Sequence, residues 1–219
     1  MITGESNTAH FNQCTFHSNT AETYAGAVFV SPGVIPKWIL NFQFCSFRRN
    51  SANVLGGSLF CVGHTVQTFS HSNFSENTAG RNGGVGFFNG CTNKFVNNSF
   101  ENNLALVGGV FSTNAAAITE SVGCLFENNV ADKFGGAISM AGMEDRVENG
   151  TFRLNSVTGL THGGGALVIG ANPNHVKAHI KNTVFESNTV AGGGGAVLIL
   201  GATSRFESCT FLKNHAASP

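Results

Sequence analysis

The 219-residue sequence predicts an all-β protein, a single-stranded right-handed parallel β-helix of about eight rungs with three short strands in each rung. One observation behind this prediction is a Phe-x-x-Asn motif that recurs eight times. A second is a Gly, usually paired, at a fixed place after each motif except the last. The third is the shortness of the apolar runs, which are four or five residues long and therefore of strand length.

The motif is spaced by 26 residues in four of its seven intervals. Its Phe stands at Phe16, Phe47, Phe74, Phe100, Phe126, Phe152, Phe185 and Phe211. An Asn follows each Phe after three residues, and an Ala or Val follows each Asn after two. Helical repeats of this length are unfavourable, because each Gly in a helix interior costs about 1 kcal/mol. The repeat therefore indicates stacked β rungs about 4.8 Å apart.

Identical positions in stacked rungs form ladders. We expect the Phe rings to point inward and stack into an apolar spine. The Asn should occupy a corner, where it tolerates the left-handed conformation and its amide bonds the Asn of the next rung. The Gly pair should form the next corner, because positive φ or close backbone approach excludes a Cβ there.

A further strand is expected before each motif. An apolar residue lies five positions before the motif Phe in seven of the eight rungs, and Ser121 breaks the row. The runs after the Gly pair, such as Ala137–Met140 and Ala166–Ile169, supply the remaining strand.

Two rungs carry extra residues. Insertions fall at 31–38, which includes Trp38, and in rung six at 159–162 and 171–175. They are five rungs apart, about 24 Å, so one compact site built from both is not expected. Trp38 is interpreted as a side cap of the coil, with a partner contact as the alternative. We expect residues 1–219 to form one repeat domain of a longer protein, because neither end shows a capping helix.

Composition excludes several classes of protein. The 12 basic and 12 acidic residues balance, so no nucleic-acid partner is expected. No apolar run approaches the roughly 18 residues of a membrane-spanning helix. The polar start of the chain does not resemble a secretory signal. Twenty Phe against one Trp and one Tyr indicate aromatic side chains used for packing.

The sequence predicts no catalytic, cofactor-binding or metal-ligating residue. Glu101, Glu127 and Glu186 each follow a motif Phe, as Ser75 does in its rung, which indicates solvated outward positions. No H-E-x-x-H motif occurs, and the loop-to-strand setting of His175 and His179 does not bring them together. Gly192 to Gly195 lacks the Lys-Ser/Thr of a phosphate-binding loop and is predicted to be a turn.

The cysteines and sequons leave questions open. Cys14, Cys45, Cys124 and Cys209 lie two residues before a motif Phe and should face inward as small hydrophobes. Cys14 and Cys45 occupy adjacent rungs, so a disulfide between them is geometrically conceivable, and reduced thiols are the alternative. Potential N-glycosylation sequons begin at Asn73, Asn97 and Asn149, and their use depends on the host.

At Phe-x-x-Asn and Gly-Gly-Ala-[Ile/Leu/Val] the chain resembles the repeats of the chlamydial polymorphic outer membrane proteins. The second motif appears at Gly136-Ala137-Ile138 and again at 165–167 and 195–197. The resemblance covers nearly the whole chain, although no barrel or signal sequence is present. It implies a β-helical passenger of an autotransporter, exposed at the surface and acting in adhesion. It transfers no catalytic residue, because the motif residues are structural.

These observations predict a non-enzymatic structural or adhesive repeat module of a secreted or cell-surface protein, outer-membrane-associated if bacterial. The module would bind a host-cell protein or glycan surface through the sides of the β-helix and needs no cofactor. The alternative is part of a carbohydrate-active, pectate-lyase-like β-helix enzyme, which requires an outward cluster of carboxylates with a Lys or Arg. An ice-binding lattice is disfavoured because no Thr-x-Thr ladder recurs.

Overall fold

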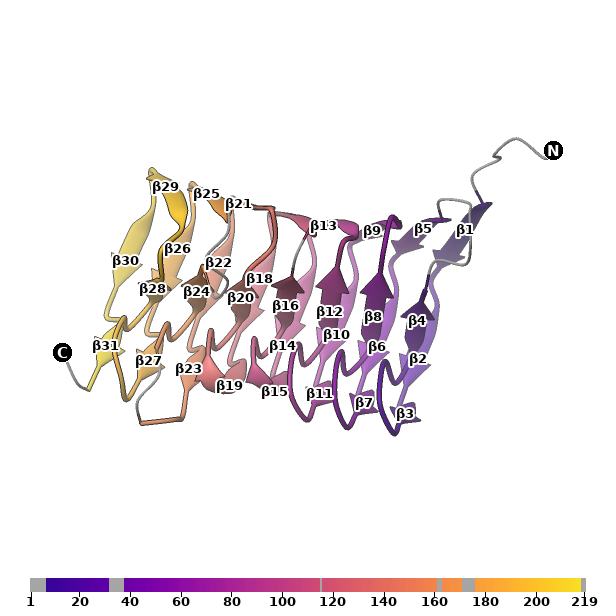
Figure 1. The fold of residues 1–219 in the computed structure, drawn as a ribbon, viewed down its shortest axis with the longest axis horizontal. Helices are drawn as coiled ribbons and strands as arrows, with labels where there is room; N and C mark the ends of the chain where they lie inside the picture. The colour runs from indigo at the N-terminus through magenta and orange to yellow at the C-terminus, as the bar shows by residue number, and fades with distance from the viewer. Residues whose placement is uncertain (1–6, 32–37, 115, 161–162, 171–175, 218–219) are drawn as a thin grey trace.

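The chain forms a parallel β-helix whose turns stack along one axis from the N-terminal to the C-terminal end (Figure 1). The computed structural model describes residues 7–31, 38–114, 116–160, 163–170 and 176–217. In these residues every regular element is a β-strand and every strand pair is parallel. The predicted all-β parallel solenoid is confirmed.

The strands form four sheets that run the length of the coil. Sheet A comprises β1 (Asn7–Asn12), β5 (Trp38–Gln43), β9 (Val66–Ser70), β13 (Thr92–Val96), β17 (Ile118–Val122), β21 (Glu144–Glu148), β25 (Lys177–Lys181) and β29 (Thr203–Glu207). Sheet B carries the motif Phe and comprises β2 (Thr15–His17), β6 (Ser46–Arg48), β10 (Asn73–Ser75), β14 (Ser99–Glu101), β18 (Leu125–Glu127), β22 (Thr151–Arg153), β26 (Val184–Glu186) and β30 (Thr210–Leu212).

The other two sheets flank the Gly corner. Sheet C comprises β3 (Thr20–Ala21), β7 (Ser51–Ala52), β11 (Thr78–Ala79), β15 (Leu104–Val107), β19 (Val130–Phe134), β23 (Ser156–Val157), β27 (Thr189–Val190) and β31 (His215–Ala216). Sheet D comprises β4 (Val28–Val30), β8 (Leu59–Val62), β12 (Gly86–Asn89), β16 (Phe111–Asn114), β20 (Ile138–Met140), β24 (Leu167–Ile169) and β28 (Val197–Ile199).

Seven rungs therefore have four short strands each, where the sequence predicted three, and the last rung has the three strands β29, β30 and β31. The additional strand is that of sheet C, which follows the motif Asn and is only two residues long in most rungs. Two residues cannot show the period-2 alternation by which a strand is recognised in a sequence.

The motif Phe residues form the predicted spine on the inner face of sheet B. The ring centroids of Phe100 and Phe126 are 4.9 Å apart, and those of Phe126 and Phe152 are 4.5 Å apart. All three rings are fully buried. The spacing follows the strand-to-strand distance of a sheet, so the ladder prediction is confirmed.

A second aromatic column lines sheet A. Phe42 and Phe69 stack with centroids 4.6 Å apart, and Phe69 and Phe95 with centroids 4.9 Å apart. Ser121 then interrupts the column in register with Phe95, as the sequence indicated. Phe111 of sheet D fills the space beside this small side chain, because its ring stacks on Phe95 at 4.4 Å.

The motif Asn residues form a continuous ladder, which is buried from Asn50 to Asn188. Asn103 donates from its backbone N and from Nδ2 to Oδ1 of Asn129, each at 3.0 Å. The same Nδ2 donates to the carbonyl of Phe74 in the preceding rung, also at 3.0 Å. Each Asn inside the ladder, from Asn50 to Asn188, thus joins three rungs, and both its amide N and its amide O have partners.

The left-handed residues lie one position earlier than predicted. Positive φ occurs at Asn102 and Asn128, directly before the ladder residues Asn103 and Asn129, and not at the ladder residues themselves. The ladder Asn stays in an ordinary backbone conformation because its role is to bond the neighbouring rungs. The turn before it is made by residues of varied type, such as Glu76.

Both reasons that the sequence suggested for Gly at this corner, positive φ and close approach of the backbones, are present in the structure. Gly135 has a φ of 61°, a left-handed conformation that favours Gly. Gly136 lies so close to the next rung that a Cβ would stand 2.1 Å from the carbonyl oxygen of Gly165. At the end of the chain Gly194 has a φ of 74°, which confirms that the Gly192 to Gly195 run is a turn.

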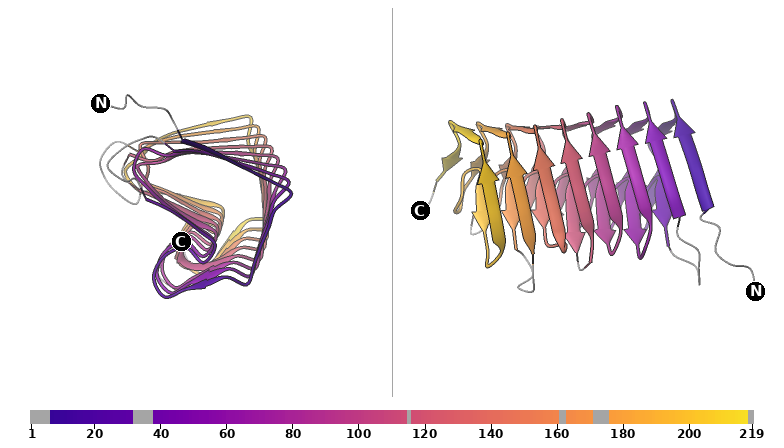
Figure 2. Two further views of the ribbon diagram at one scale, coloured as in Figure 1. Left: turned by 90° about the vertical axis from the view of Figure 1, so that its right-hand side faces the viewer. Right: turned by 90° about the horizontal axis from the view of Figure 1, so that it is seen from above.

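The turns are indented on one side. Viewed along the coil, the outline folds inward between sheets C and D (Figure 2). This indentation runs alongside the outward residues of sheet D, whereas sheets A and B present broad outer faces.

Candidate functional site

The repeated motif residues are structural. Phe126 and Asn129 are fully buried, and the Gly136 position admits no side chain. Any surface chemistry must therefore come from the outward residues between the motifs. Three regions are candidates: the outer face of sheet B, the outer face of sheet A, and the indentation beside sheet D.

The outer face of sheet B carries the Glu row that the sequence placed outward. Glu101, Glu127 and Glu186 are half-buried residues beside fully buried Phe residues, and Ser75 occupies the same row, so the outward assignment is confirmed. Arg153 of the next rung reaches back to Glu127, with Nη2 2.6 Å from Oε1. This row contributes ion pairs between rungs, and such exposed pairs add little stability.

Glu76 is the centre of another surface ion-pair group. Arg49 Nε lies 2.7 Å from its Oε2 and Arg48 Nη2 lies 2.8 Å from its Oε1. The hydrogen bond from Arg49, followed by that from Arg48, lowers the pKa of Glu76. The carboxylate is held ionised by two cations, which is not the state of a general acid.

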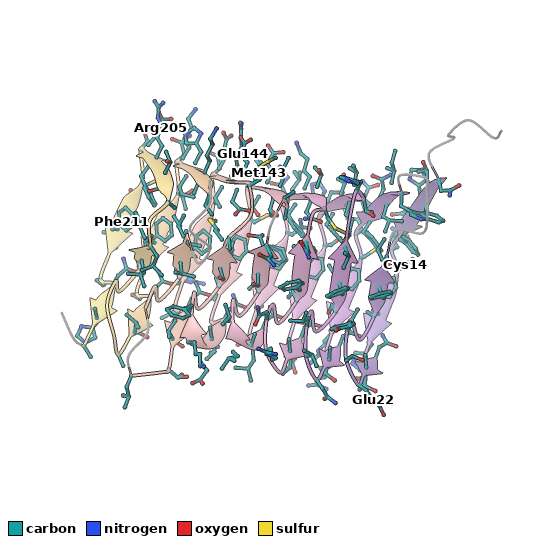
Figure 3. All side chains as sticks on the ribbon, viewed as in Figure 1. Cys14, Glu22, Met143, Glu144, Arg205 and Phe211 are labelled. Carbon is teal, nitrogen blue, oxygen red and sulfur yellow. A yellow bond between two sulfur atoms is a disulfide. The ribbon has the colours of Figure 1, made fainter. Side chains whose placement is uncertain are left out.

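The outer face of sheet A is rich in charges of both signs. Arg146 Nη2 lies 2.6 Å from Glu144 Oε1, and Lys94 Nζ lies 2.9 Å from Glu120 Oε2. Glu144 and Arg205 project from this edge of the coil in Figure 3. The hydrogen bonds that Arg146 donates to the Glu144 carboxylate raise the pKa of Arg146, and the charges of Glu120 and Glu148 act in the same direction.

A shallow hollow of about 230 Å³ lies on this face, between β21, β25 and β29. Its lining includes Glu144, Arg146, Lys177 and His179. His179 Nε2 lies 3.1 Å from Glu207 Oε2, and this contact is the main reason that the pKa of Glu207 is lowered. The hollow thus carries paired charges on an open surface.

Metal-ligand geometry is not found in the described part of the chain. No group of three His, Cys, Asp or Glu side chains there converges in a way that could hold a metal ion. His175 lies outside the described residues, so its expected separation from His179 is not tested. Nor do the described residues contain a helix of the length and hydrophobicity needed to cross a membrane.

The structure forms a disulfide that the sequence analysis did not propose. Cys61 of β8 and Cys91, just before β13, are bonded and fully buried. The conceivable Cys14–Cys45 bond is absent, because both residues are free thiols. Cys45 and Cys124 are buried and face inward as predicted, while Cys14 and Cys209 in the end rungs are half-buried.

The two buried free thiols, Cys45 and Cys124, are not in a nucleophilic state. Burial raises the pKa of Cys124 to about 11, and burial also raises that of Cys45. A thiol with a raised pKa remains protonated at neutral pH and is a poor nucleophile. This agrees with the interpretation of these residues as small hydrophobes.

Asp145 is the buried acid that the sequence analysis did not single out. It points inward from β21 and is 1% exposed. Its Oδ2 accepts a hydrogen bond of 3.1 Å from Thr113 Oγ1, whereas its Oδ1 has no partner in the structure. Burial raises the pKa of this carboxyl to about 7.

Asp145 ends a column of buried polar side chains on the inner face of sheet A. Gln67, Asn93, Thr119 and Asp145 follow one another in register in four successive rungs. Each has at least one buried polar atom without a hydrogen-bond partner in the structure. In the sequence these polar residues stand at strand positions that face inward and are normally apolar. They can be recognised as one column only when the register of the strands is known.

The indentation contains an uncharged groove, called here the sheet D groove. It is a cavity of about 260 Å³ lined by Asn82, Phe87, Val107, Ser112, Thr113, Asn114, Ser139 and Ala141. Phe87, Ser112 and Ser139 occupy one outward row of β12, β16 and β20. Asn82 and Val107 pair with each other on the sheet C side.

An outer aromatic column leads into this groove. Phe29, Phe60 and Phe87 lie in one row, and their successive ring centroids are 5.3 and 5.7 Å apart. Tyr24 stacks on Phe60 at 4.7 Å. Phe29 is 54% exposed, so the column begins at the surface. The excess of Phe predicted aromatic side chains used for packing, and this outward column was not predicted.

The structure also bears on Trp38 and on the three N-glycosylation sequons. Trp38 is half-buried at the start of β5 and packs against the core, which agrees with a side cap, although residues 32–37 before it lie outside the described residues. Asn73, Asn97 and Asn149 are all exposed, so each sequon is accessible.

Comparison with known families agrees with this architecture. Residues 123–140 and 182–199 match the model of the Chlamydia polymorphic membrane protein repeat. The chain carries repeats of this type. The matched segments each run from the Phe-x-x-Asn motif through the Gly pair into sheet D, which are the positions that form the ladders.

This repeat type indicates a surface or outer-membrane protein module, and the family is not a known enzyme family. No curated protein and no solved structure matches the chain. The family match therefore supports the fold and an association with a cell surface or outer membrane. The binding partner has to be inferred from the outer faces of the coil described above.

Proposed function

We propose that residues 1–219 form one non-enzymatic, adhesive repeat module of a secreted or cell-surface protein, which binds host surfaces through the sides of its β-helix. One observation carries this proposal: every recurring motif residue is used to build the coil. Phe126, Asn129 and Gly136 are buried or sterically closed, so the scaffold is constant from rung to rung. The outward residues between them vary, which is the arrangement of a binding scaffold.

The coil suits binding to an extended or repetitive surface. Parallel strands in register place outward side chains in rows that run along the axis, and the hydrogen-bonded ladders keep these rows rigid. A rigid display loses little conformational entropy on binding. Repeated contacts along one face also favour multivalent attachment.

The direct test is attachment of the purified chain to animal cells. Beads coated with the folded chain should bind cells saturably, and soluble chain should compete for this binding. Beads coated with heat-denatured chain provide the matched control, because they carry the same residues without the ordered rows. Binding that is no greater than this control, or that soluble chain fails to reduce, would contradict the proposal.

A carbohydrate-active enzyme is the second candidate, and one observation favours it. Glu120, Glu144 and Glu148 surround the Arg146 cation on sheet A, which is the outward cluster of carboxylates with an Arg that this alternative requires. Incubation with polyuronides should release oligosaccharides if this cluster is catalytic, and Arg146→Ala should stop the release. The absence of product would leave the adhesive proposal as the better one.

A further inference from the structure

We propose that the sheet D groove is a binding site for an uncharged saccharide. The inference rests on the proposed function, because it names the chemistry of the partner that one side of the coil recognises. The groove offers the three kinds of contact that a neutral sugar requires: hydroxyl groups, amide groups and an aromatic surface.

The hydroxyl groups of the groove are available for a ligand. Ser112 and Ser139 point outward from successive rungs of sheet D, and both residues are nearly buried, at 4% and 2% exposure. Neither hydroxyl has a hydrogen-bond partner among the described residues of the protein. By contrast, Thr113 Oγ1, which also lines the cavity, is fully engaged by Asp145 and by the backbone N of Ala141 and Gly142.

The aromatic surface arises where the outer column ends. Each ring of this column is covered by the ring of the next rung as far as Phe87. The next residue in the row is Ser112, which is too small to cover the ring of Phe87. One side of that ring therefore borders the groove, where the C–H groups of a sugar can pack on it. Asn82 and Val107, which pair with each other, also line the groove.

The groove differs from the rest of the surface in charge. None of its eight lining residues is charged, whereas the outer faces of sheets A and B carry the ion pairs described above. An acidic saccharide would find no counter-charge in the groove and would lose hydration on entering it. An uncharged saccharide keeps its hydrogen bonds through hydroxyl and amide partners.

A peptide fits this groove less well than a saccharide. Extended peptides usually bind to β proteins by adding a strand to a free edge. The strands β12, β16 and β20 are each paired on both sides, so the groove offers no free backbone edge. A peptide lying there would have to satisfy its backbone groups from a few side chains. The hydroxyl groups of a sugar radiate in several directions and match scattered side-chain partners.

The test uses the intact chain, one groove variant and one matched control. Ser112→Phe fills the cavity and should fold, because the same row already accepts Phe at residues 29, 60 and 87. Ser75→Phe makes the same chemical change on the outer face of sheet B. Binding is measured by titration calorimetry with uncharged oligomers of glucose, galactose and N-acetylglucosamine, and with oligogalacturonate as the acidic comparator.

We expect saturable binding of at least one uncharged oligomer, an affinity at least about tenfold lower in Ser112→Phe, and unchanged affinity in Ser75→Phe. The inference is overturned if no uncharged oligomer binds at millimolar concentration, if only oligogalacturonate binds, or if Ser112→Phe binds as well as the original chain. Circular dichroism and thermal unfolding confirm that both variants are folded.

The cell-binding assay separates this inference from the proposed function. If cells bind while no uncharged oligomer does, the saccharide site is overturned and the adhesive proposal stands. If Ser112→Phe then also abolishes cell binding and oligogalacturonate does not bind either, the occupant of the groove is a protein. If an uncharged oligomer binds in the groove and cells do not bind, the saccharide site stands and the adhesive proposal fails.

Discussion

Thr113 and Asp145 face each other across the interior of the coil, and Thr113 Oγ1 donates a hydrogen bond of 3.1 Å to Asp145 Oδ2. Thr113 belongs to sheet D and Asp145 to sheet A, 32 residues later. The backbone N of Ala141 and that of Gly142 each donate to the same Thr113 oxygen at 3.0 Å. This buried polar contact is surrounded by the apolar core, so it makes the stability of the coil sensitive to pH.

The first prediction concerns this pH dependence. The pKa of Asp145 is raised to about 7 in the folded protein from 3.8, because burial disfavours the carboxylate. Between pH 3.8 and about pH 7, Asp145 is therefore protonated in the folded state and ionised in the unfolded state. In that window the contribution of Asp145 to the free energy of unfolding should fall by about 1.4 kcal/mol for each pH unit of increase. Above about pH 7 the loss is complete and the contribution is constant.

Denaturant unfolding at pH values from 4.5 to 8 measures this effect. Asp145→Asn should remove the slope, since an amide does not ionise. Asp132→Asn is the matched control, because Asp132 is exposed on β19, and it should keep the slope of the original chain. An unchanged slope in Asp145→Asn would show that the carboxyl is not the source of the pH dependence.

The second prediction concerns the Cys61–Cys91 disulfide. It closes a loop of 30 residues between two neighbouring rungs. Such a loop corresponds to a stabilisation of about 3 to 4 kcal/mol, mainly through restriction of the unfolded chain. Unfolding in denaturant with and without a reducing agent should show this difference. The variant Cys61→Ser/Cys91→Ser should be insensitive to the reducing agent.

Thiol counting provides the control for this bond. Four cysteines of the chain are free and two are bonded. The denatured, unreduced protein should therefore react with four equivalents of a thiol reagent, and six reactive thiols would contradict the pairing. Cys209→Ser removes a free, half-buried thiol and should leave the response to the reducing agent unchanged.

The sequence predicted the features that depend only on period. The Phe spine and the Asn ladder were identifiable because the same residue type recurs in phase at Phe100, Phe126, Asn103 and Asn129. The prediction misplaced the left-handed residue by one position. That position holds Ser, Arg, Glu, Asn, Leu or Lys in different rungs and so gives no residue-type signal. The strands of sheet C were missed because they are too short to show a pattern.

The features that depend on the cross-section of the coil were not predictable. Cys61 and Cys91 are 30 residues apart, which is not the period of the repeat, and they meet only because sheet D lies near the start of sheet A in the next rung. The sheet D groove likewise depends on the inward fold between sheets C and D (Figure 2). A repeat length determines which residues stack, but not the shape of the turn that they form.

The third prediction concerns the Asn ladder. Asn129→Ala removes the acceptor for the backbone N and Nδ2 of Asn103 and the donor to the carbonyl of Phe100. These groups are buried, and each one left unsatisfied costs about 1 to 3 kcal/mol. We expect a loss of at least about 3 kcal/mol in the free energy of unfolding, measured in denaturant.

The adjacent residue supplies the control for this prediction. Asn128 is exposed, has a φ of 53°, and its side-chain amide donates a hydrogen bond to Asn102 Oδ1. Asn128→Gly retains a left-handed conformation without strain, so its effect should be below about 1 kcal/mol. Equal effects of the two substitutions would mean that the ladder hydrogen bonds do not hold the rungs together.

The fourth prediction concerns the second Gly of the corner. In Gly136→Ala the new Cβ would stand 2.1 Å from the carbonyl oxygen of Gly165 and 2.7 Å from the backbone N and O of Ser156. These are backbone atoms of the next rung, which cannot move without breaking the hydrogen bonds of the ladder. The rungs must therefore separate locally, and we expect a loss of more than about 3 kcal/mol or failure to fold. Far-ultraviolet circular dichroism and denaturant unfolding measure both outcomes.

Gly193→Ala makes the same substitution in the Gly-rich turn of a later rung. Apart from its two chain neighbours, no atom of the described residues lies within 4 Å of a Cβ added there, and Gly193 does not have a positive φ. Alanine also reduces the conformational freedom of the unfolded chain, so stability should be unchanged or increase by about 0.4 to 1 kcal/mol. If Gly136→Ala were tolerated as well as Gly193→Ala, close stacking of backbones would not be the reason for Gly at this corner. The opposite signs expected for the two variants thus separate the steric role of the second Gly from the general flexibility of a Gly-rich turn.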